Sequence, residues 1–244
     1  MKKLIIIIMS ISLLFFIISC GNNNKDYSEN NGNLQMDNNN NLLSEEKKIN
    51  NNPYSSVTKG DIIEFGGFDW RVLDVQDGKA LILSEYILFT KAYHSSNQEI
   101  TWEQCDLREY LNGEFYDNTF SAEEKAYIIE SAIVNNDDEW YDTDGGSDTT
   151  DNVFLLSTEE VVEYFGDSGQ FTDRPDDKID DEYNEARRAF TKNGEMQWWW
   201  LRSPGGKNNE AAIIAGFGMV GLTGFYVGRD TGGVRPAFWL NTES

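Results

Sequence analysis

Trp198-Trp199-Trp200-Leu201-Arg202 contains three of the seven tryptophans of this chain. In an extended strand, neighbouring side chains point to opposite faces, so Trp198 and Trp200 share one face and Trp199 lies on the other. At least one of these faces must be buried, because so much contiguous apolar surface is rarely left in contact with water. We therefore predict a core strand here. A tryptophan that the core does not use is available to contact a ligand.

Further strands are predicted on both sides of this one. After it come three candidates separated by glycines that permit tight turns: residues 211–217, 224–227 and 234–240. Before it, Gly66-Gly67 lies between two apolar stretches and predicts a hairpin. Asp77-Gly78 predicts a second turn before residues 80–83. The chain thus has a β-meander near its start and a glycine-rich β region near its end.

Helices are predicted between these two β regions. The signal for each is a capping box, a Ser or Thr followed three residues later by Glu or Gln. Three such pairs open the expected helices: Thr101/Gln104, Ser121/Glu124 and Ser157/Glu160. The first helix is expected to reach Gly113, and the third to end at Gly166. The second is expected to place Ile129 and Ile133 on its apolar face.

A single α+β domain is predicted over residues 57–244. Residues 152–156 are expected to form a strand between the helices, and the highly charged residues 167–188 an exposed loop or irregular helix. The order of strands, helices and strands favours an α+β domain over a repeated strand–helix–strand sheet. A region of this length can bury a core of its own.

The N-terminus is typical of an exported lipoprotein. Lys2-Lys3 precedes an apolar stretch, residues 4–18, that is shorter than the roughly 20 residues needed to cross a bilayer. It ends in Ile17-Ile18-Ser19-Cys20, which resembles the lipobox of bacterial lipoproteins. That resemblance implies cleavage before Cys20 and attachment of lipid to its sulfur. Residues 1–19 are interpreted as a signal peptide, with an uncleaved membrane anchor as the alternative.

Residues 20–56 are expected to comprise the lipidated cysteine and a disordered tether. Residues 21–52 contain 13 asparagines and few large apolar groups. Such a segment cannot bury enough apolar surface to offset the entropy lost on ordering. We therefore predict that the folded domain begins at Val57 and is held away from the membrane surface.

Charge and rare residues exclude several classes of function. The formal net charge is −22, which would repel nucleic acid phosphates and anionic lipid headgroups, so no nucleic acid partner is expected. Cys105 has no partner if Cys20 is lipidated, and is interpreted as a small buried hydrophobe. His94 is the only histidine and is interpreted as a surface-loop residue. Zinc sites of the Cys/His type are therefore excluded.

An acidic loop offers weak calcium candidates. Asp142, Asp144 and Asp148 supply the oxygen ligands that calcium prefers. Their spacing does not fit the EF-hand pattern, because Gly145-Gly146-Ser147 lacks the third acid and places its glycines wrongly. A solvated acidic loop is the favoured interpretation. Neither a metal nor any other cofactor is expected.

Several motifs together resemble a known bacterial domain. They are Phe-Asp-Trp-Arg-Val-Leu at 68–73, Val-Phe-Leu-Leu-Ser at 153–157, Trp-Trp-Leu-Arg-Ser-Pro-Gly at 199–205 and Gly-Val-Arg-Pro-Ala-Phe-Trp-Leu at 233–240. The series resembles an uncharacterised extracellular domain of unknown function over most of residues 60–240. The tryptophan-rich strand and the terminal strand are more remotely similar to the C-type-lectin-like fold, which includes the formylglycine-generating sulfatase modifiers. This resemblance implies a ligand face on the later strands and loops.

The function predicted from these features is non-enzymatic binding by a membrane-anchored, extracytoplasmic lipoprotein. The expected ligand is a glycan or a peptide, contacted by residues of the C-terminal β region: Trp199, Arg202, Asn208, Asn209, Tyr226 and Arg229. In the competing interpretation all three tryptophans are buried and Arg202 and Arg235 form structural salt bridges. An envelope enzyme such as a carboxylate-based hydrolase, and a structural envelope protein, are the alternative functions.

Lipidation of Cys20 is directly testable. Replacing it, Cys20→Ala, removes the sulfur that would carry the lipid, so metabolic labelling with a fatty-acid probe is expected to mark the unchanged chain and not the variant. Cys105→Ala is the matched control and should be labelled normally. Equal labelling of the unchanged chain and Cys20→Ala would contradict the interpretation of the N-terminus.

Overall fold

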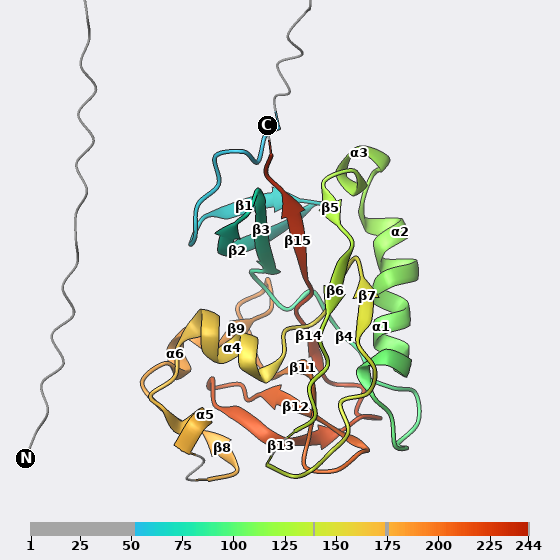
Figure 1. Cartoon of the computed structure of the whole chain (residues 1–244), viewed down its shortest axis with the longest axis vertical. Coiled ribbons are helices and arrows are strands. Elements are labelled where there is room, and N and C mark those ends of the chain that lie inside the picture. The colour runs from blue at the N-terminus through green and yellow to red at the C-terminus, as the bar shows by residue number, and fades with distance from the viewer. Residues whose placement is uncertain (1–51, 139, 174–175, 244) are drawn as a thin grey trace, which may run out of the picture. The chain divides into compact units, whose positions relative to one another are not determined.

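The first and last strands of the folded region belong to one sheet. The computed structural model describes residues 52–138, 140–173 and 176–243, and Figure 1 shows its two main sheets at opposite ends of this region. The first is antiparallel with the order β1-β2-β3-β15-β5. Its strands are β1 (Ile62–Phe65), β2 (Phe68–Gln76), β3 (Lys79–Ser84), β5 (Ile128–Ile129) and β15 (Ala237–Asn241). Pairing of β15 with β3 therefore closes the domain.

Both hairpin turns predicted near the start are confirmed. Gly66 and Gly67 join β1 to β2 with φ angles of 57° and 75°. Asp77 and Gly78 join β2 to β3 with φ angles of 49° and 73°. Two consecutive positive φ angles define the type I′ class of turn, whose twist matches that of the flanking strands. The local sequence was sufficient to set these turns.

The second sheet contains the tryptophan-rich strand. Its order is β4-β14-β11-β12-β13-β8, and all pairs are antiparallel except β11 with β14. The strands are β4 (Phe89–Thr90), β8 (Lys178–Ile179), β11 (Trp199–Pro204), β12 (Glu210–Ile214), β13 (Val220–Tyr226) and β14 (Gly233–Val234). The predicted C-terminal strands are thus present with shifted ends, and residues 234–240 divide between β14 and β15, one in each sheet.

Both faces of β11 are covered. Trp199 and Trp200 are completely buried, whereas Trp198 is partly exposed. The indole Nε1 of Trp199 donates to the carbonyl of Arg187 at 3.2 Å, and that of Trp200 donates to the carbonyl of Lys91 at 3.0 Å. Each buried ring therefore has a partner for its one polar atom, as burial of tryptophan requires.

The first predicted helix differs from the structure at both ends. Thr101 makes no side-chain cap, and a short 3-10 turn at Trp102–Gln104 precedes α1 (Asp106–Tyr110). Cys105 is the N-cap, and its sulfur accepts a hydrogen bond from the Arg108 amide. Helical structure then continues past Gly113 through a π-helical segment, Leu111–Phe115, into α2 (Tyr116–Thr119). Gly113 does not end the helical structure here, and Leu111 and Phe115 on either side of it are buried in the core.

The other two capping boxes are confirmed. Ser121 and Glu124 cap α3 (Ala122–Lys125), and Ser157 and Glu160 cap α4 (Thr158–Phe165). The helix after Ser121 is one turn long, so the expected apolar helix face over Ile129 and Ile133 is wrong. The chain instead forms β5 and then β6 (Ser131–Ile133), which pairs with β7 (Thr149–Asp151).

Two further segments also depart from expectation. The predicted strand at 152–156 lies just after β7, and only Phe154 makes a strand-like bridge, to Ala237. Among the described residues of 167–188, Ile179 and Arg187 are buried and the others are partly or fully exposed. The short helices α5 (Gln170–Asp173) and α6 (Asn184–Arg187) agree with the expected irregular helix, whereas the strand β8 was not expected. A small hairpin follows α6. That hairpin pairs β9 (Ala189–Phe190) with β10 (Met196–Gln197). The α+β class is nevertheless correct. None of the helices in the described residues could span a membrane.

Described residues that precede Val57, the expected start of the domain, contact the rest of the fold. Asn52 is buried, and its side-chain amide donates to the carbonyls of Asn241 and Glu243 at 2.9 and 3.0 Å. The ring of Tyr54 packs against Phe65 and Tyr127, with centroids 5.5 and 5.3 Å apart. The end of the expected tether is therefore part of the domain. Cys20, the expected signal peptide and residues 21–51 lie outside the described residues.

A truncation test measures what this N-terminal segment contributes. A chain that starts at Val57 loses the Tyr54 contacts and the Asn52 hydrogen bonds, which should cost about 2 kcal/mol. For a domain of this size we expect the Tm to fall by about 4–8 °C relative to a chain that starts at Asn52. Thermal unfolding followed by circular dichroism measures both. Identical midpoints would show that residues 52–56 add nothing to stability.

Candidate functional site

A cleft of about 500 Å³ lies at the C-terminal end of β11. It is lined from four directions: by the loop after β6, the start of α4, α5, and the strands β11 and β13. The lining residues are Asn136, Asp137, Asp138, Trp140, Thr158, Glu159, Phe171, Ser203, Pro204 and Leu222. Its volume is in the range of small-ligand pockets, and it combines aromatic rings with several polar side chains. We therefore treat it as the candidate functional site.

Arg202 holds three walls of the cleft together. Its guanidinium forms a two-pronged ion pair with Glu160 on α4, at 2.5 and 2.9 Å. It also donates to the carbonyl of Leu155 at 2.8 Å and to that of Val134 at 3.2 Å. The side chain is only 5% exposed, so these partners replace the water that the charge has lost. Arg202 thereby fixes β11, α4 and the loop after β6 relative to one another.

Two hydroxyl groups bind the start of α4: that of Ser203 joins the helix to β11, and that of Ser157 caps it. The amide of Thr158 donates to the hydroxyl of Ser203 at 3.0 Å, and the amide of Glu160 donates to that of Ser157 at 3.2 Å. The Glu160 carboxylate accepts in return from the Ser157 amide at 2.9 Å. Ser203 is therefore both a lining residue and a structural link.

Acidic side chains shape the loop wall by accepting backbone hydrogen bonds. Asp138 accepts from the amides of Trp140 and Tyr141 at 2.7 and 3.2 Å. Asp137 accepts from the amide of Gly145 at 2.9 Å. These hydrogen bonds fix the backbone of the loop wall around Trp140 and Gly145.

The loop does not assemble the weak calcium candidates into a site. Asp144 accepts from the amide of Gly146 at 2.8 Å, and Asp148 accepts from that of Asn135 at 3.0 Å. Asp142 is exposed and has a φ of 56°, which suits a tight turn. Among the described residues, no group of three or more acids, histidines or cysteines is arranged to hold a metal ion.

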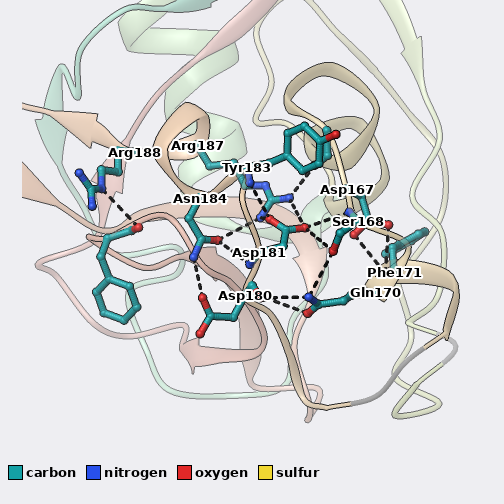
Figure 2. Close-up of polar contacts among 12 residues, drawn as sticks. Asp167, Ser168, Gln170, Phe171, Asp180, Asp181, Tyr183, Asn184, Arg187 and Arg188 are labelled. Atoms are coloured by element: carbon teal, nitrogen blue, oxygen red, sulfur yellow. Dashed lines mark hydrogen bonds and ion pairs between the residues drawn. The ribbon is translucent and has the colours of Figure 1, made fainter.

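Two aromatic rings pack against each other at the cleft. Trp140 comes from the loop and Phe171 from α5, and their centroids lie 5.6 Å apart at an angle of 55°. The backbone of Phe171 is fixed by Asp167, whose carboxylate accepts the Phe171 amide hydrogen at 3.2 Å (Figure 2). The position of one ring thus depends on the segment that carries α5.

A buried ion pair anchors that segment. The guanidinium of Arg187 lies 3.0 Å from the Asp181 carboxylate, and the two side chains are 0% and 1% exposed. Arg187 also donates to the carbonyl of Gly166, while Asp181 accepts from the amide and hydroxyl of Ser168 (Figure 2). Burial opposes ionisation of Asp181, but the hydrogen bonds from Arg187 and Ser168 outweigh it and hold the pKa of this carboxyl below its ordinary value.

Two of the predicted ligand contacts are in the interior. Trp199 is completely buried, and Arg235 packs over its ring at 4.9 Å, so the prediction that Trp199 contacts a ligand is wrong. Arg202 is buried in the ion pair with Glu160, so its predicted place on the binding surface is also wrong, and the structural alternative describes it. The cause is the covering of both faces of β11, which a strand pattern alone does not reveal.

The remaining predicted contacts lie on a neighbouring surface. Asn208 and Asn209 line a second, more open hollow of about 540 Å³, together with Asn97, Gln98, Glu99, Asp142, Thr143 and Lys207. Tyr226 is 46% exposed, and the ammonium of Lys207 lies 5.9 Å from its ring centroid. Arg229 is exposed and packs over the ring of Phe225 at 4.3 Å. The predicted asparagines therefore meet in space, but apart from the aromatic cleft.

The cysteine and the histidine have structural surroundings. Cys105 is buried, and its burial raises the pKa of its thiol to about 12, which leaves it protonated and unreactive. His94 is buried rather than on the surface as predicted. Its Nδ1 lies 3.1 Å from the Asp106 carboxylate, and its Nε2 lies 3.1 Å from the Gln98 amide nitrogen.

The comparison with protein families covers this whole site. A family model described as a domain of unknown function, DUF6273, matches residues 77–242. The chain belongs to the DUF6273 family. No curated protein and no solved structure matches the chain. The matched part of this DUF6273 protein includes every described residue that lines the cleft and the buried arginines Arg187, Arg202 and Arg235.

Several cleft residues of this DUF6273 protein were not predicted. Trp140 stands beside Tyr141 in an otherwise acidic stretch, and large aromatic side chains among acids were the available signal. Phe171 and Glu159 give no signal of their own. They reach the cleft only because α4 and α5 pack beside β11 and the loop, and such long-range packing is not encoded in a local pattern.

The Asp181–Arg187 pair gives a pH-dependent prediction. Asp181→Asn leaves the buried Arg187 without an anionic partner and should cost about 3 kcal/mol at neutral pH. Since the pKa of Asp181 is lowered in the fold, its stabilisation is complete above the ordinary value of about 4 and is lost as the pH falls through the lower folded pKa. Urea unfolding of both proteins as a function of pH measures this.

The matched control for that experiment is Asp180→Asn. Asp180 is exposed, and its carboxylate accepts a hydrogen bond from the Asn184 side chain at 2.6 Å. This change should alter stability by under about 1 kcal/mol. Equal effects of the two substitutions, or a difference that does not shrink in acid, would rule out the assigned role of the buried pair.

Proposed function

We propose that this DUF6273 protein is a non-enzymatic binding protein whose cleft holds a glycan. The observation that carries the proposal is the adjacent pair of aromatic rings, Trp140 and Phe171, in a cleft that also presents Asn136, Asp137 and Glu159. Sugar rings have apolar C–H faces and hydroxyl edges. Aromatic rings suit the faces, and amide and carboxylate side chains suit the hydroxyls.

A peptide is the less favoured ligand. Extended peptides commonly bind by adding a strand to an exposed sheet edge, and their backbone supplies most of the hydrogen bonds. The edge strands of the six-stranded sheet, β4 and β8, contain two residues each and offer little template for such pairing. The cleft instead presents side-chain oxygens and nitrogens, which favour a ligand rich in hydroxyl groups.

The carboxylate-based hydrolase is the second candidate. It requires one carboxyl group that stays protonated until it donates its proton. In the cleft, the Asp138 carboxylate accepts two amide hydrogen bonds and Asp137 accepts a third, so both carboxylates hold the backbone of the loop. Carboxylates that are engaged in this way support binding over acid catalysis.

The cellular setting belongs to the same proposal. The sequence Ile17-Ile18-Ser19-Cys20 supports a lipid anchor on an extracytoplasmic face of a bacterial membrane. The Asn-rich residues before Asn52 would then separate the cleft from that membrane. A C-type-lectin-like fold is also kept as a proposal. It is supported by the order of strands, helices and strands.

Trp140 is the residue whose loss tests glycan binding most directly. The full-length chain in a nonionic detergent is applied to an array of bacterial and host glycans, and Trp140→Ala should lower the affinity for any bound glycan by about tenfold or more. The control is Trp239→Ala, which removes another partly buried tryptophan, in the five-stranded sheet. No glycan bound by the unchanged chain, or equal losses in both variants, would refute the proposal.

A further inference from the structure

Arg235 differs from the other buried arginines of this protein. It lies between β14 and β15, where the chain passes from one main sheet to the other, and it is only 3% exposed. Arg187 is also buried, and it forms an ion pair with Asp181. Arg202 is buried too, and it forms an ion pair with Glu160. No described carboxylate forms an ion pair with Arg235, so its charge lacks the compensation that the other two have.

Backbone carbonyls and an aromatic ring hold the guanidinium of Arg235 in place. Its Nε and Nη2 donate to the carbonyl of Ser84 at 3.0 and 2.9 Å, and Nη2 also reaches the carbonyl of Glu85 at 3.3 Å. The group packs over the ring of Trp199, 4.9 Å from the centroid. These contacts fix its orientation, and they leave the buried Nη1 without a hydrogen-bond partner among the described residues.

The hydroxyl of Ser84 is a second buried donor of the same kind. Ser84 ends β3 and is completely buried, and its Oγ makes no hydrogen bond with any described residue. The carbonyl of this same residue accepts twice from Arg235, so the two unpartnered groups belong to residues in direct contact. Buried donors without acceptors are costly and rare, and two on adjoining side chains indicate a shared acceptor.

The charges around Arg235 do not balance. Arg71 donates to both oxygens of the Glu85 carboxylate, at 2.8 and 2.5 Å, so the acid nearest in sequence to Ser84 is already paired. Arg71, Glu85 and Arg235 together carry two positive charges and one negative charge. Burial lowers the pKa of Arg235 to about 10, while Glu85 raises it and Arg71 lowers it further. The guanidinium is therefore still charged at neutral pH, and a buried charge is costly without a partner.

We infer that Arg235 and Ser84 form a buried binding site for a small inorganic anion, with chloride as its occupant. An anion accepts hydrogen bonds from the guanidinium and the hydroxyl together, and it supplies the missing negative charge. A water molecule would satisfy the two donors but not the charge. Two donors in a buried setting also favour a monatomic ion over an oxyanion, which has more acceptor atoms to satisfy. This site is separate from the aromatic cleft and does not depend on the proposed glycan.

Thermal unfolding at constant ionic strength tests the inference. The full-length chain in nonionic detergent is unfolded in buffers where chloride replaces gluconate, an anion too large to be buried. Binding to the folded state should raise the Tm by about 3 °C or more between about 1 mM and about 300 mM chloride. Ser84→Ala should lose most of this rise, and at low chloride it should be at least as stable as the unchanged chain, because it buries no unpartnered hydroxyl. Ser96→Ala, at an exposed serine, is the matched control and should keep the full rise.

Bromide locates the ion directly, because it replaces chloride and scatters X-rays anomalously. In bromide-soaked crystals of the protein we expect an anomalous peak within hydrogen-bond distance of Nη1 of Arg235. Arg187 and Arg202 are internal controls, and their carboxylate partners should exclude such a peak. A water molecule without anomalous signal, or a carboxylate in contact with Arg235, would overturn the inference. So would a Tm that does not depend on chloride, or an equal rise in Ser84→Ala.

Discussion

The guanidinium of Arg202 lies where three separately formed parts of the fold meet. It belongs to the core strand β11, and its partners are Glu160 on α4, the carbonyl of Leu155 before that helix, and the carbonyl of Val134 after β6. Removing one partner of a buried ion pair leaves an uncompensated charge, so these partners cannot be moved independently. The cleft takes its width from this constraint, because each tethered part contributes one of its walls.

A second buried arginine repeats the arrangement on the other side of the same strand. Arg187 pairs with Asp181 and orders the segment that carries Phe171. Its carbonyl accepts the indole hydrogen of Trp199, which connects that segment directly to β11. The tryptophan-rich strand β11 therefore helps to position the two aromatic rings of the cleft, Trp140 and Phe171, although none of its own tryptophans lines the cleft. A ligand would meet surfaces whose spacing is set by the core, which lowers the entropic cost of binding.

Sequence patterns predicted the features that depend on a few neighbouring residues. The hairpin at Gly66-Gly67 and the capping boxes at Ser121 and Ser157 need only local backbone geometry, and all three are present. The predicted exposure of Trp199 was wrong. The carbonyl of Arg187 accepts the indole hydrogen of the buried Trp199, and the charge pattern had assigned the segment that contains Arg187 to solvent. The cleft itself joins residues between 136 and 222, and no periodicity in the sequence reports contacts over such distances.

The overall charge of the chain is too diffuse to explain selectivity. At physiological salt, fields from surface carboxylates decay over about 8 Å, so a net charge of −22 attracts any cation weakly and without preference for place. Discrimination needs charges that face a ligand where water is partly excluded. Asp137 and Glu159 meet that condition because they share the cleft with Trp140 and Phe171. In the cleft these carboxylates therefore lie beside apolar surface, where a charge interacts more strongly than it does in bulk water.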